Sequence, residues 1–245
     1  MSLTIYPLHL GELQVDYSFL VWQTKCGTPT WIPVTAWLVT GAEKPILIDA
    51  GFRDAQEGSA STGLPVRRSA EQTLEAQLNK YGMKPEHIGY LIHTHLHMDH
   101  AGLDYKLTNA RIIVKRKELQ AAATPFYPTA FYDRVDIARL RNDLFDRIDF
   151  IDEDLELFPG IRTVHAPGHT PAHQMIYVQV PSGAAVIAGD AAMLTEENVK
   201  QGIPPGFYYD LGDVILSQQR LAREAKYVLP THDETVFTLY SEGIR

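Results

Sequence analysis

The stretch His95-Leu96-His97-Met98-Asp99-His100 places three imidazoles and one carboxylate within six residues. It follows an apolar run, Ile88-Gly89-Tyr90-Leu91-Ile92, that is typical of a buried strand. Imidazole nitrogen and carboxylate oxygen are the ligands that zinc and similar divalent metals prefer. Since α/β proteins place their chemistry where strands end, the pattern predicts a metal site at a sheet edge. A polar loop that is merely rich in histidine is the alternative, and it explains the number and type of ligands less well.

The composition is that of an ordinary globular protein. The chain has 245 residues, 45% of them hydrophobic and 21% charged, and we expect one domain spanning residues 1–245. The net charge is −8, and Lys and Arg come close to clustering only in residues 111–117. A phosphate backbone requires clustered positive charge, so we expect no nucleic-acid partner.

The ends and the cysteine content favour a cytoplasmic location. The N-terminus lacks a basic segment followed by a long apolar one, so no signal peptide is predicted. No apolar run reaches the roughly 18 residues that span a bilayer, so we expect no membrane association. Cys26 is the single cysteine, which excludes an intrachain disulfide and a thiolate metal cluster and fits a reducing compartment.

The first third of the chain reads as strands joined by turns. Residues 3–10 and 31–40 are rich in apolar and β-branched residues, and Ile46-Leu47-Ile48 ends at Asp49-Ala50-Gly51. Residues 52–68 are rich in Gly, Ser, Asp and Gln, which predicts a long surface loop that serves as a site lid or a subunit contact.

A helix follows that loop. Ser69 and Gln72 have the spacing of a capping box, Leu74, Leu78 and Tyr81 form one apolar stripe, and Gly82 supplies the stop.

The remainder alternates between strand and helix patterns, which favours layered sheets with outer helices. The aromatic stretch 126–132 is either an apolar wall over the site, packing of a long connection or a dimer contact, so the chain is expected to be a monomer or a homodimer. The predicted strands are 112–114, 161–164, 175–180, 184–188 and 227–229, and the predicted helices are 116–123 and 213–226.

Three further metal-competent side chains follow strand patterns. They are His169, Asp190 and His232, each at a transition from strand to loop. With the opening motif they make five imidazoles and two carboxylates, too many for one tetrahedral zinc. This set suits two metals a few ångströms apart that share a carboxylate.

The same series resembles the metallo-β-lactamase superfamily over nearly the whole chain. The sequences of His95–Gly102 and Ala166–Gln174 are similar to the corresponding motifs of the N-acyl homoserine lactonases and of related lactone hydrolases. The resemblance implies an αβ/βα sandwich of two mixed β-sheets flanked by helices. It also implies a dinuclear site for two Zn²⁺ ions, or for Mn, Co or Fe, at one edge of the sheets.

Carried over position by position, the resemblance assigns each ligand. His95, His97 and His169 bind the first metal; Asp99, His100 and His232 bind the second, and Asp190 bridges them. Two cations lower the pKa of a shared water, so that hydroxide is available at neutral pH to attack the carbonyl of a lactone ring. Asp99 is also placed to pass a proton to the departing alkoxide.

One position departs from the lactonase pattern. These lactonases usually carry a tyrosine three residues after the bridging aspartate, and here that residue is Met193, which donates no hydrogen bond. Tyr208 or Tyr209 from a nearby loop takes over the role, Tyr209 being our choice as a catalytic residue, or the role is absent. The departure bears on the substrate more than on the reaction class.

Several other polar residues have candidate supporting roles. Asp49 is expected to accept the second N–H of a ligand imidazole, and Asp233 is either a similar partner or an exposed loop carboxylate. His173 either makes such a hydrogen bond or packs in the interior, and His93 is expected to be a hydrogen-bonded core histidine.

Two other function classes stay open. One is thioester hydrolysis of the glyoxalase II kind or phosphoester hydrolysis, which the acidic balance disfavours because those substrates call for a basic patch. The other is a non-catalytic metal-binding or redox module; flavodiiron relatives carry a flavin domain for which no residues remain here.

Overall fold

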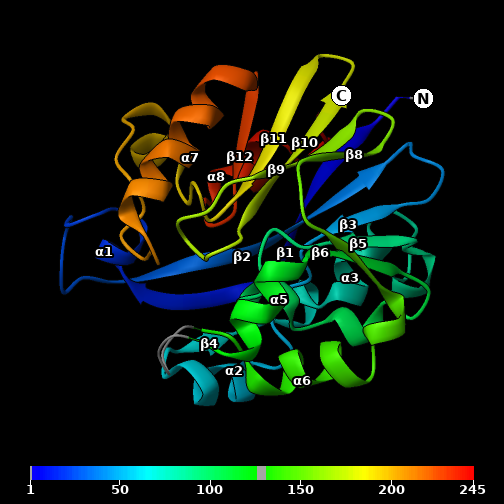
Figure 1. Cartoon of the computed structure of the whole chain (residues 1–245), viewed down its shortest axis with the longest axis horizontal. Helices are drawn as coiled ribbons and strands as arrows, with labels where there is room; N and C mark the ends of the chain where they lie inside the picture. The colour runs from blue at the N-terminus through cyan, green and yellow to red at the C-terminus, as the bar shows by residue number, and fades with distance from the viewer. Residues whose placement is uncertain (1, 126–130) are drawn as a thin grey trace.

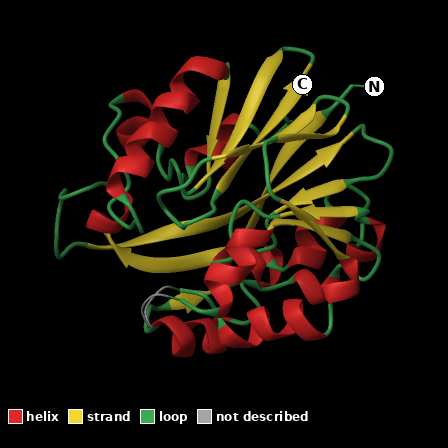
Figure 2. Cartoon of the chain, in the orientation of Figure 1, coloured by secondary structure: helices red, strands yellow, loops and turns green. Residues whose placement is uncertain are grey.

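A computed structural model of the chain describes residues 2–125 and 131–245 (Figure 1). Two mixed β-sheets pack face to face, and helices cover the outer face of each sheet (Figure 2). The predicted αβ/βα sandwich is confirmed. Within the described residues, no helix is both long and apolar enough to span a membrane.

The first sheet has the strand order β4-β1-β2-β3-β5-β6-β7. Its first half is antiparallel, and β3, β5, β6 and β7 run parallel to one another. The carboxyl ends of those parallel strands therefore meet at one edge. The strands are β1 (Thr4–Asp16), β2 (Pro29–Thr40), β3 (Ile46–Ile48), β4 (Val66–Arg67), β5 (Tyr90–Ile92), β6 (Arg111–Lys115) and β7 (Ile148–Ile151).

The second sheet has the order β12-β11-β10-β9-β8. Only the β11–β12 pair of this sheet is parallel, so these two strands also end at a common edge. The strands are β8 (Leu155–Phe158), β9 (Ile161–His165), β10 (Gln174–Val180), β11 (Gly183–Gly189) and β12 (Tyr227–Pro230).

The helices lie mainly on the two outer faces. In Figure 1, α2, α3, α5 and α6 lie below the first sheet, and α7 covers the second. The helices are α1 (Tyr17–Leu20), α2 (Ala55–Thr62), α3 (Leu74–Asn79), α4 (Met98–Ala101), α5 (Arg116–Ala123), α6 (Arg134–Asn142), α7 (Leu211–Glu224) and α8 (Thr235–Leu239). A π-helical turn spans Thr195–Lys200, and short 3-10 turns span Ala70–Gln72, Pro85–His87, Asp104–Lys106 and Phe145–Arg147.

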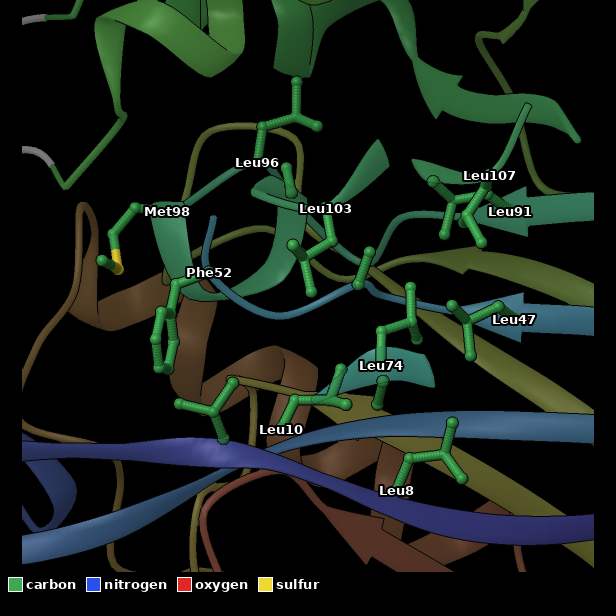
Figure 3. Close-up of a cluster of buried hydrophobic side chains, with 14 of the residues drawn as sticks. Leu8, Leu10, Leu47, Phe52, Leu74, Leu91, Leu96, Met98, Leu103 and Leu107 are labelled. Atoms are coloured by element: carbon green, nitrogen blue, oxygen red, sulfur yellow. The ribbon is translucent and has the colours of Figure 1, made fainter. Parts of the chain in front are cut away.

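The core has three apolar layers. The central one lies between the sheets and joins residues such as Trp37 and Ile92 to Ile176 and Ile187. A second fills the space between the first sheet and its helices (Figure 3), and a third lies under α7. Burial of these side chains is the main favourable contribution to folding, at roughly 25 cal/mol per Å² of apolar surface.

The prediction of a surface loop over residues 52–68 is wrong. The segment contains α2, whose first turn is capped by Asp54 through backbone N–H groups of Gln56 and Glu57 at 2.8 and 3.1 Å. Gly63 ends the helix with a φ of +75°. The helix buries Gly58 and no large apolar side chain, so it has no hydrophobic periodicity for a sequence pattern to reveal.

The helix predicted from Ser69 to Gly82 is shorter than expected. Gln72 does accept the Ser69 N–H at 2.8 Å, but this contact closes a single 3-10 turn. Thr73 is extended and starts α3 instead, by accepting the backbone N–H of Ala76 at 3.2 Å. Ser69 and Thr73 are both able to cap a helix N-terminus, and it is Thr73 that begins α3.

Most other predicted elements are confirmed, with small shifts at their ends. Helix 116–123 matches α5, and the helix predicted for 213–226 is α7, which begins earlier because Asp210 caps it through the Asp213 N–H at 2.9 Å. In the aromatic stretch 126–132, residues 126–130 lie outside the described residues, so its predicted role stays untested. The sequence patterns did not reveal β7, β8, α6 or α8.

Candidate metal centre

The predicted ligands come from strand ends of both sheets. His95 follows the parallel strand β5, whereas Asp190 and His232 follow the parallel strands β11 and β12. Asp49, predicted as a supporting residue, follows β3, the neighbour of β5. His169 follows β9. Because the two sheets face each other, their carboxyl-end loops meet along one edge of the sandwich (Figure 1).

Successive side chains at the start of the His95–His100 motif point alternately to the candidate metal centre and to the apolar core. His95 and His97 lie in the centre, while Leu96 and Met98 are buried at 1% and 3% exposure in the helix-side core (Figure 3). Alternation is what an extended backbone produces, since successive side chains point to opposite faces. The motif is therefore held by apolar packing on one face and presents imidazoles on the other, and its last residues form the short helix α4.

Three imidazole nitrogens converge in what we call the first triad, His95, His97 and His169. His97 Nδ1 lies 3.0 Å from both His95 Nε2 and His169 Nε2. All three side chains are buried. Nitrogen atoms brought together in this way form a face that a tetrahedral metal fits.

The second triad consists of Asp99, His100 and His232. Asp99 Oδ2 lies 3.6 Å from His100 Nε2 and 3.7 Å from His232 Nε2. Asp99 and His100 are consecutive residues of α4, and His232 follows β12 of the second sheet.

Asp190 lies between the triads. Its Oδ2 is 3.1 Å from His169 Nε2, and its Oδ1 is 3.4 Å from His100 Nε2 and 3.3 Å from His232 Nε2. Thr231 donates its hydroxyl to Oδ1 at 2.8 Å, which fixes the orientation of the carboxylate. One oxygen thus faces each triad, as a bridging carboxylate requires.

The second nitrogen of most ligand imidazoles donates to a buried oxygen. Nδ1 of His100 donates to Asp49 at 2.8 Å, that of His232 to the Pro33 carbonyl at 2.8 Å, and that of His169 to the Phe207 carbonyl at 3.0 Å. His95 Nδ1 lies 3.0 Å from the Thr94 hydroxyl oxygen, whose own proton goes to Asp49 at 2.7 Å. These contacts fix the tautomers that leave the inward nitrogens free to bind a metal.

Two glycines permit the close approach of the loops. Gly168 has a φ of +128°, and a Cβ there would lie 2.3 Å from the backbone nitrogen of Val214, so α7 packs directly on the His169 loop. Gly189 has a φ of +53°, and a Cβ would lie 2.4 Å from His173 Nε2. Any larger residue at either position would displace a ligand loop.

The electrostatics suit bound cations. Burial, reinforced by neighbouring imidazoles, lowers the pKa of His95 and of His97, so both rings are neutral and keep a lone pair. Burial opposes charge on Asp190, but His232, His169 and His100 outweigh it and lower its pKa, so the carboxylate is ionised.

The residues present fit two metal ions. Five imidazoles and two carboxylates converge, and His100 Nε2 is buried without a hydrogen-bond partner among the described residues. A buried ring nitrogen that faces two carboxylates without a hydrogen bond to either suits a positive charge at that point, which a proton or a metal ion supplies. The assignment of each residue as a ligand stays a proposal, and it is the one that the family resemblance implies.

An apolar slot opens onto this centre. Asp99, Asp190 and His232 are among the residues that line it. Apart from the proposed ligands, Thr62 is the one polar side chain among the described residues that line it. The apolar walls include Leu13, Val15, Leu20, Ile32, Leu64, Val66 and Met193.

Met193, which stands where the lactonases carry a tyrosine, and Tyr209, its predicted replacement, line different cavities. Met193 is buried and lines the slot, and its carbonyl accepts the His232 N–H at 3.2 Å. Tyr209 is 53% exposed and lines a second, separate cavity on the other side of His97 and His169. The catalytic role of Tyr209 stays a prediction, and Tyr208 lines neither cavity.

The predictions for the supporting residues have mixed outcomes. Asp49 accepts from His100 as expected, and His93 is a buried core histidine 2.9 Å from Asp104. His173 makes a supporting contact, since its Nε2 accepts the Asp190 N–H at 3.0 Å. Asp233 supports no ligand ring: it accepts from Thr195 and Thr235 instead.

Sequence reasoning missed Glu118, Thr94 and Thr231. Thr94 and Thr231 each directly precede a proposed ligand, and this adjacency is a weak sequence signal for a supporting role. No sequence signal pointed to Glu118, because it lies in a helix that precedes the His169 loop by about fifty residues.

A family model described as the metallo-beta-lactamase superfamily matches residues 29–232, and the chain belongs to this superfamily. Among curated relatives, it is 29% identical to an N-acyl homoserine lactonase of Bacillus cereus over 82% of this chain and 80% of the relative. It is 29% identical to N-acyl homoserine lactonase AttM of Azorhizobium caulinodans over 99% of this chain and 97% of that one.

The solved structures agree with these relatives. An N-acyl homoserine lactone hydrolase with the product N-hexanoyl-L-homoserine at its catalytic metal centre superposes with a TM-score of 0.85 and 25% identity. The match covers 100% of both chains. A dizinc quorum-quenching lactonase at 18% identity has a TM-score of 0.70, a likeness that concerns the fold alone.

Proposed function

We propose that residues 1–245 form one hydrolase domain that opens the ring of an N-acyl homoserine lactone or a related cyclic ester. The observation that carries the proposal is the position of Asp190, which lines the apolar slot and whose two oxygens face the two triads. Relatives named as lactonases over nearly the full chain support the same reaction.

The proposed cofactor is a pair of zinc ions. His95, His97 and His169 would hold the first, Asp99, His100 and His232 the second, and Asp190 would contact both. When bound, such a pair would make hydroxide available at neutral pH and would stabilise negative charge on the ring carbonyl and the leaving oxygen. Imidazole and carboxylate donors also accept Mn, Co or Fe, so the native metal needs direct measurement.

Asp99 is the side chain placed to move a proton. Its side chain is 12% exposed, more than that of Asp190 at 5%, and it is a member of the second triad that lines the slot. Opening of a lactone produces an alkoxide that must be protonated, and a carboxylate at the site of bond cleavage can take a proton from the attacking oxygen and pass it to that alkoxide. Asp99 thus combines metal binding with proton transfer in this proposal.

The slot supports a substrate with an apolar chain. A lactone ring at the triads would place its substituent among Leu13, Val15 and Ile32, where burial of each methylene contributes about 0.8 kcal/mol. A charged substituent such as glutathione would find no cationic side chain among the described residues that line either cavity. This favours an N-acyl lactone over a glutathione thioester.

The test is a panel of substrates offered to zinc-reconstituted protein. We expect the highest kcat/KM on homoserine lactones with medium or long acyl chains, and lower values on aromatic lactones, on a glutathione thioester and on a phosphodiester. A higher kcat/KM on the thioester would replace the proposal with the glyoxalase II-like alternative. Equal turnover by verified metal-free protein would remove the metal mechanism altogether.

A further inference from the structure

Glu118 is a buried carboxylate that the proposed chemistry does not use. It lies in the first turn of α5 and is 1% exposed, and it faces the loops of the metal centre. Burying a carboxylate is costly unless hydrogen bonds compensate, so the partners of this group show why it is retained.

Four donors surround the Glu118 carboxylate. Oε1 accepts the Leu96 N–H at 3.2 Å and the Tyr132 hydroxyl at 3.0 Å. Oε2 accepts the Thr170 hydroxyl at 2.8 Å and the Ala172 N–H at 3.3 Å. Both oxygens are therefore used, and each accepts one backbone N–H and one hydroxyl.

Each donor belongs to a segment that carries or contacts the first triad. Leu96 lies between His95 and His97, and Thr170 directly follows His169. The ring of Tyr132 lies 4.8 Å from that of His97, centroid to centroid. A single carboxylate thus joins two loops that are more than seventy residues apart and come from different sheets.

We propose that Glu118 is a positioning residue that sets the separation of His97 and His169 and thereby the affinity of the first triad for its metal. The inference rests on the proposed metal centre and adds a determinant outside the ligand set. Glu118 contacts no reacting atom; it acts through the two loops.

The second triad has independent supports. Asp49 orients His100, and the Pro33 carbonyl orients His232, each at 2.8 Å. Neither contact involves Glu118 or α5. Loss of the Glu118 carboxylate is therefore expected to weaken one metal site and spare the other.

Glu118→Gln is the sharpest variant because it keeps the shape of the side chain. A carboxamide offers one accepting oxygen and one donating nitrogen. The two hydroxyls can reverse and accept, but a backbone N–H cannot, so either amide orientation leaves the Leu96 or the Ala172 N–H facing a donor. Glu118→Asp keeps four acceptor positions on a shorter side chain and serves as the conservative variant.

The readout is metal binding, measured without substrate. Metal-free protein is titrated with zinc against a competing chelator, and the cobalt-loaded form is followed by its visible spectrum. His97→Ala and His232→Ala give reference signatures for loss of the first and of the second metal. Asp136→Asn is the matched control, since it replaces another buried carboxyl group, on α6, that contacts no proposed ligand among the described residues.

We expect Glu118→Gln to weaken the first metal about 10–100-fold, with a cobalt spectrum like that of His97→Ala, while the second metal binds as in wild type. Glu118→Asp should recover part of that affinity, and Asp136→Asn should bind both metals normally. Unchanged affinity of the first metal in Glu118→Gln, or equal weakening of both, would overturn the proposal.

If Glu118→Gln does not fold, Glu118→Asp decides, and equal behaviour of its two metals contradicts the inference. A wild-type protein that binds two metals but opens no lactone would overturn the proposed function and leave the role of Glu118 intact.

Discussion

Asp49 Oδ2 lies 2.8 Å from Nδ1 of His100, on the opposite side of the ring from the nitrogen that faces Asp190. The same carboxylate accepts the Thr94 N–H at 2.8 Å through Oδ1, so it joins the end of β3 to the motif loop after β5. Asp49 therefore fixes both the tautomer of a proposed ligand and the start of the motif.

Asp49→Asn should lower the affinity of the second metal by about 10–100-fold. Asparagine tolerates the φ of +60° at this position, so the backbone is preserved while the acceptor facing His100 is weakened. Metal content after dialysis against a chelator series measures the effect. Retention of both metals at wild-type affinity would show that the contact is dispensable.

Asp190→Asn should abolish most lactone opening, with a loss of at least about 100-fold in kcat. The asparagine side chain presents one oxygen and one NH2 group, so it cannot accept toward both triads. Zinc-to-protein stoichiometry and initial rates on a long-chain homoserine lactone are measured together. Wild-type rates with one zinc per chain would mean that bridging is not required.

Leu64→Trp should narrow the apolar slot and discriminate by chain length. The Leu64 side chain lines the slot and is partly exposed, so a larger ring can be accommodated without unfolding the core. We expect kcat/KM on long acyl chains to fall about ten-fold relative to short ones, as a few lost methylene contacts imply. The control is Leu155→Trp at an exposed site on β8, which should leave the ratio unchanged.

Tyr209→Phe tests the side chain predicted to replace the missing tyrosine. If its hydroxyl positions the ring carbonyl, kcat should fall about ten-fold with normal metal content. An unchanged kcat would remove Tyr209 from the mechanism, an outcome compatible with its position in the second cavity.

Asp136 gives a prediction for stability against pH. Burial and the neighbouring Asp133 raise its pKa to about 8, although Arg53 lies 3.1 Å away. From about pH 4 to pH 8, the folded chain holds a proton that the unfolded chain releases, so this group's contribution to stability is lost as pH rises.

The Asp136→Asn variant lacks that loss. Its free energy of unfolding relative to wild type should therefore increase by about 1 kcal/mol or more from pH 5 to pH 8. Urea unfolding of both metal-free proteins measures the difference, and titration of the ligand histidines cancels between them. A difference that stays flat with pH would place the pKa of Asp136 in its ordinary range.

The sequence by itself indicated the candidate metal ligands and, through the resemblance of its motifs, the fold class. His95 to His100 carry donors at a spacing that metal chemistry recognises, and the strand patterns before them, before Asp190 and before His232 indicate where such donors meet. These signals are local, because the type of a ligand and the periodicity of a strand can both be recognised from a few consecutive residues. Where local signals were weak or competed, as in α2 and at Thr73, the sequence-based prediction failed.

Only the tertiary structure decided which atoms come together. The pairing of Glu118 with Thr170, of Asp49 with His100 and of His173 with the Asp190 N–H depends on sheet order and loop packing. No spacing along the chain encodes such contacts, because their geometry is set by the burial of apolar layers that press the two sheets together. The sequence therefore supplied the candidate donors, and the packed sandwich decided how each of these side chains is oriented.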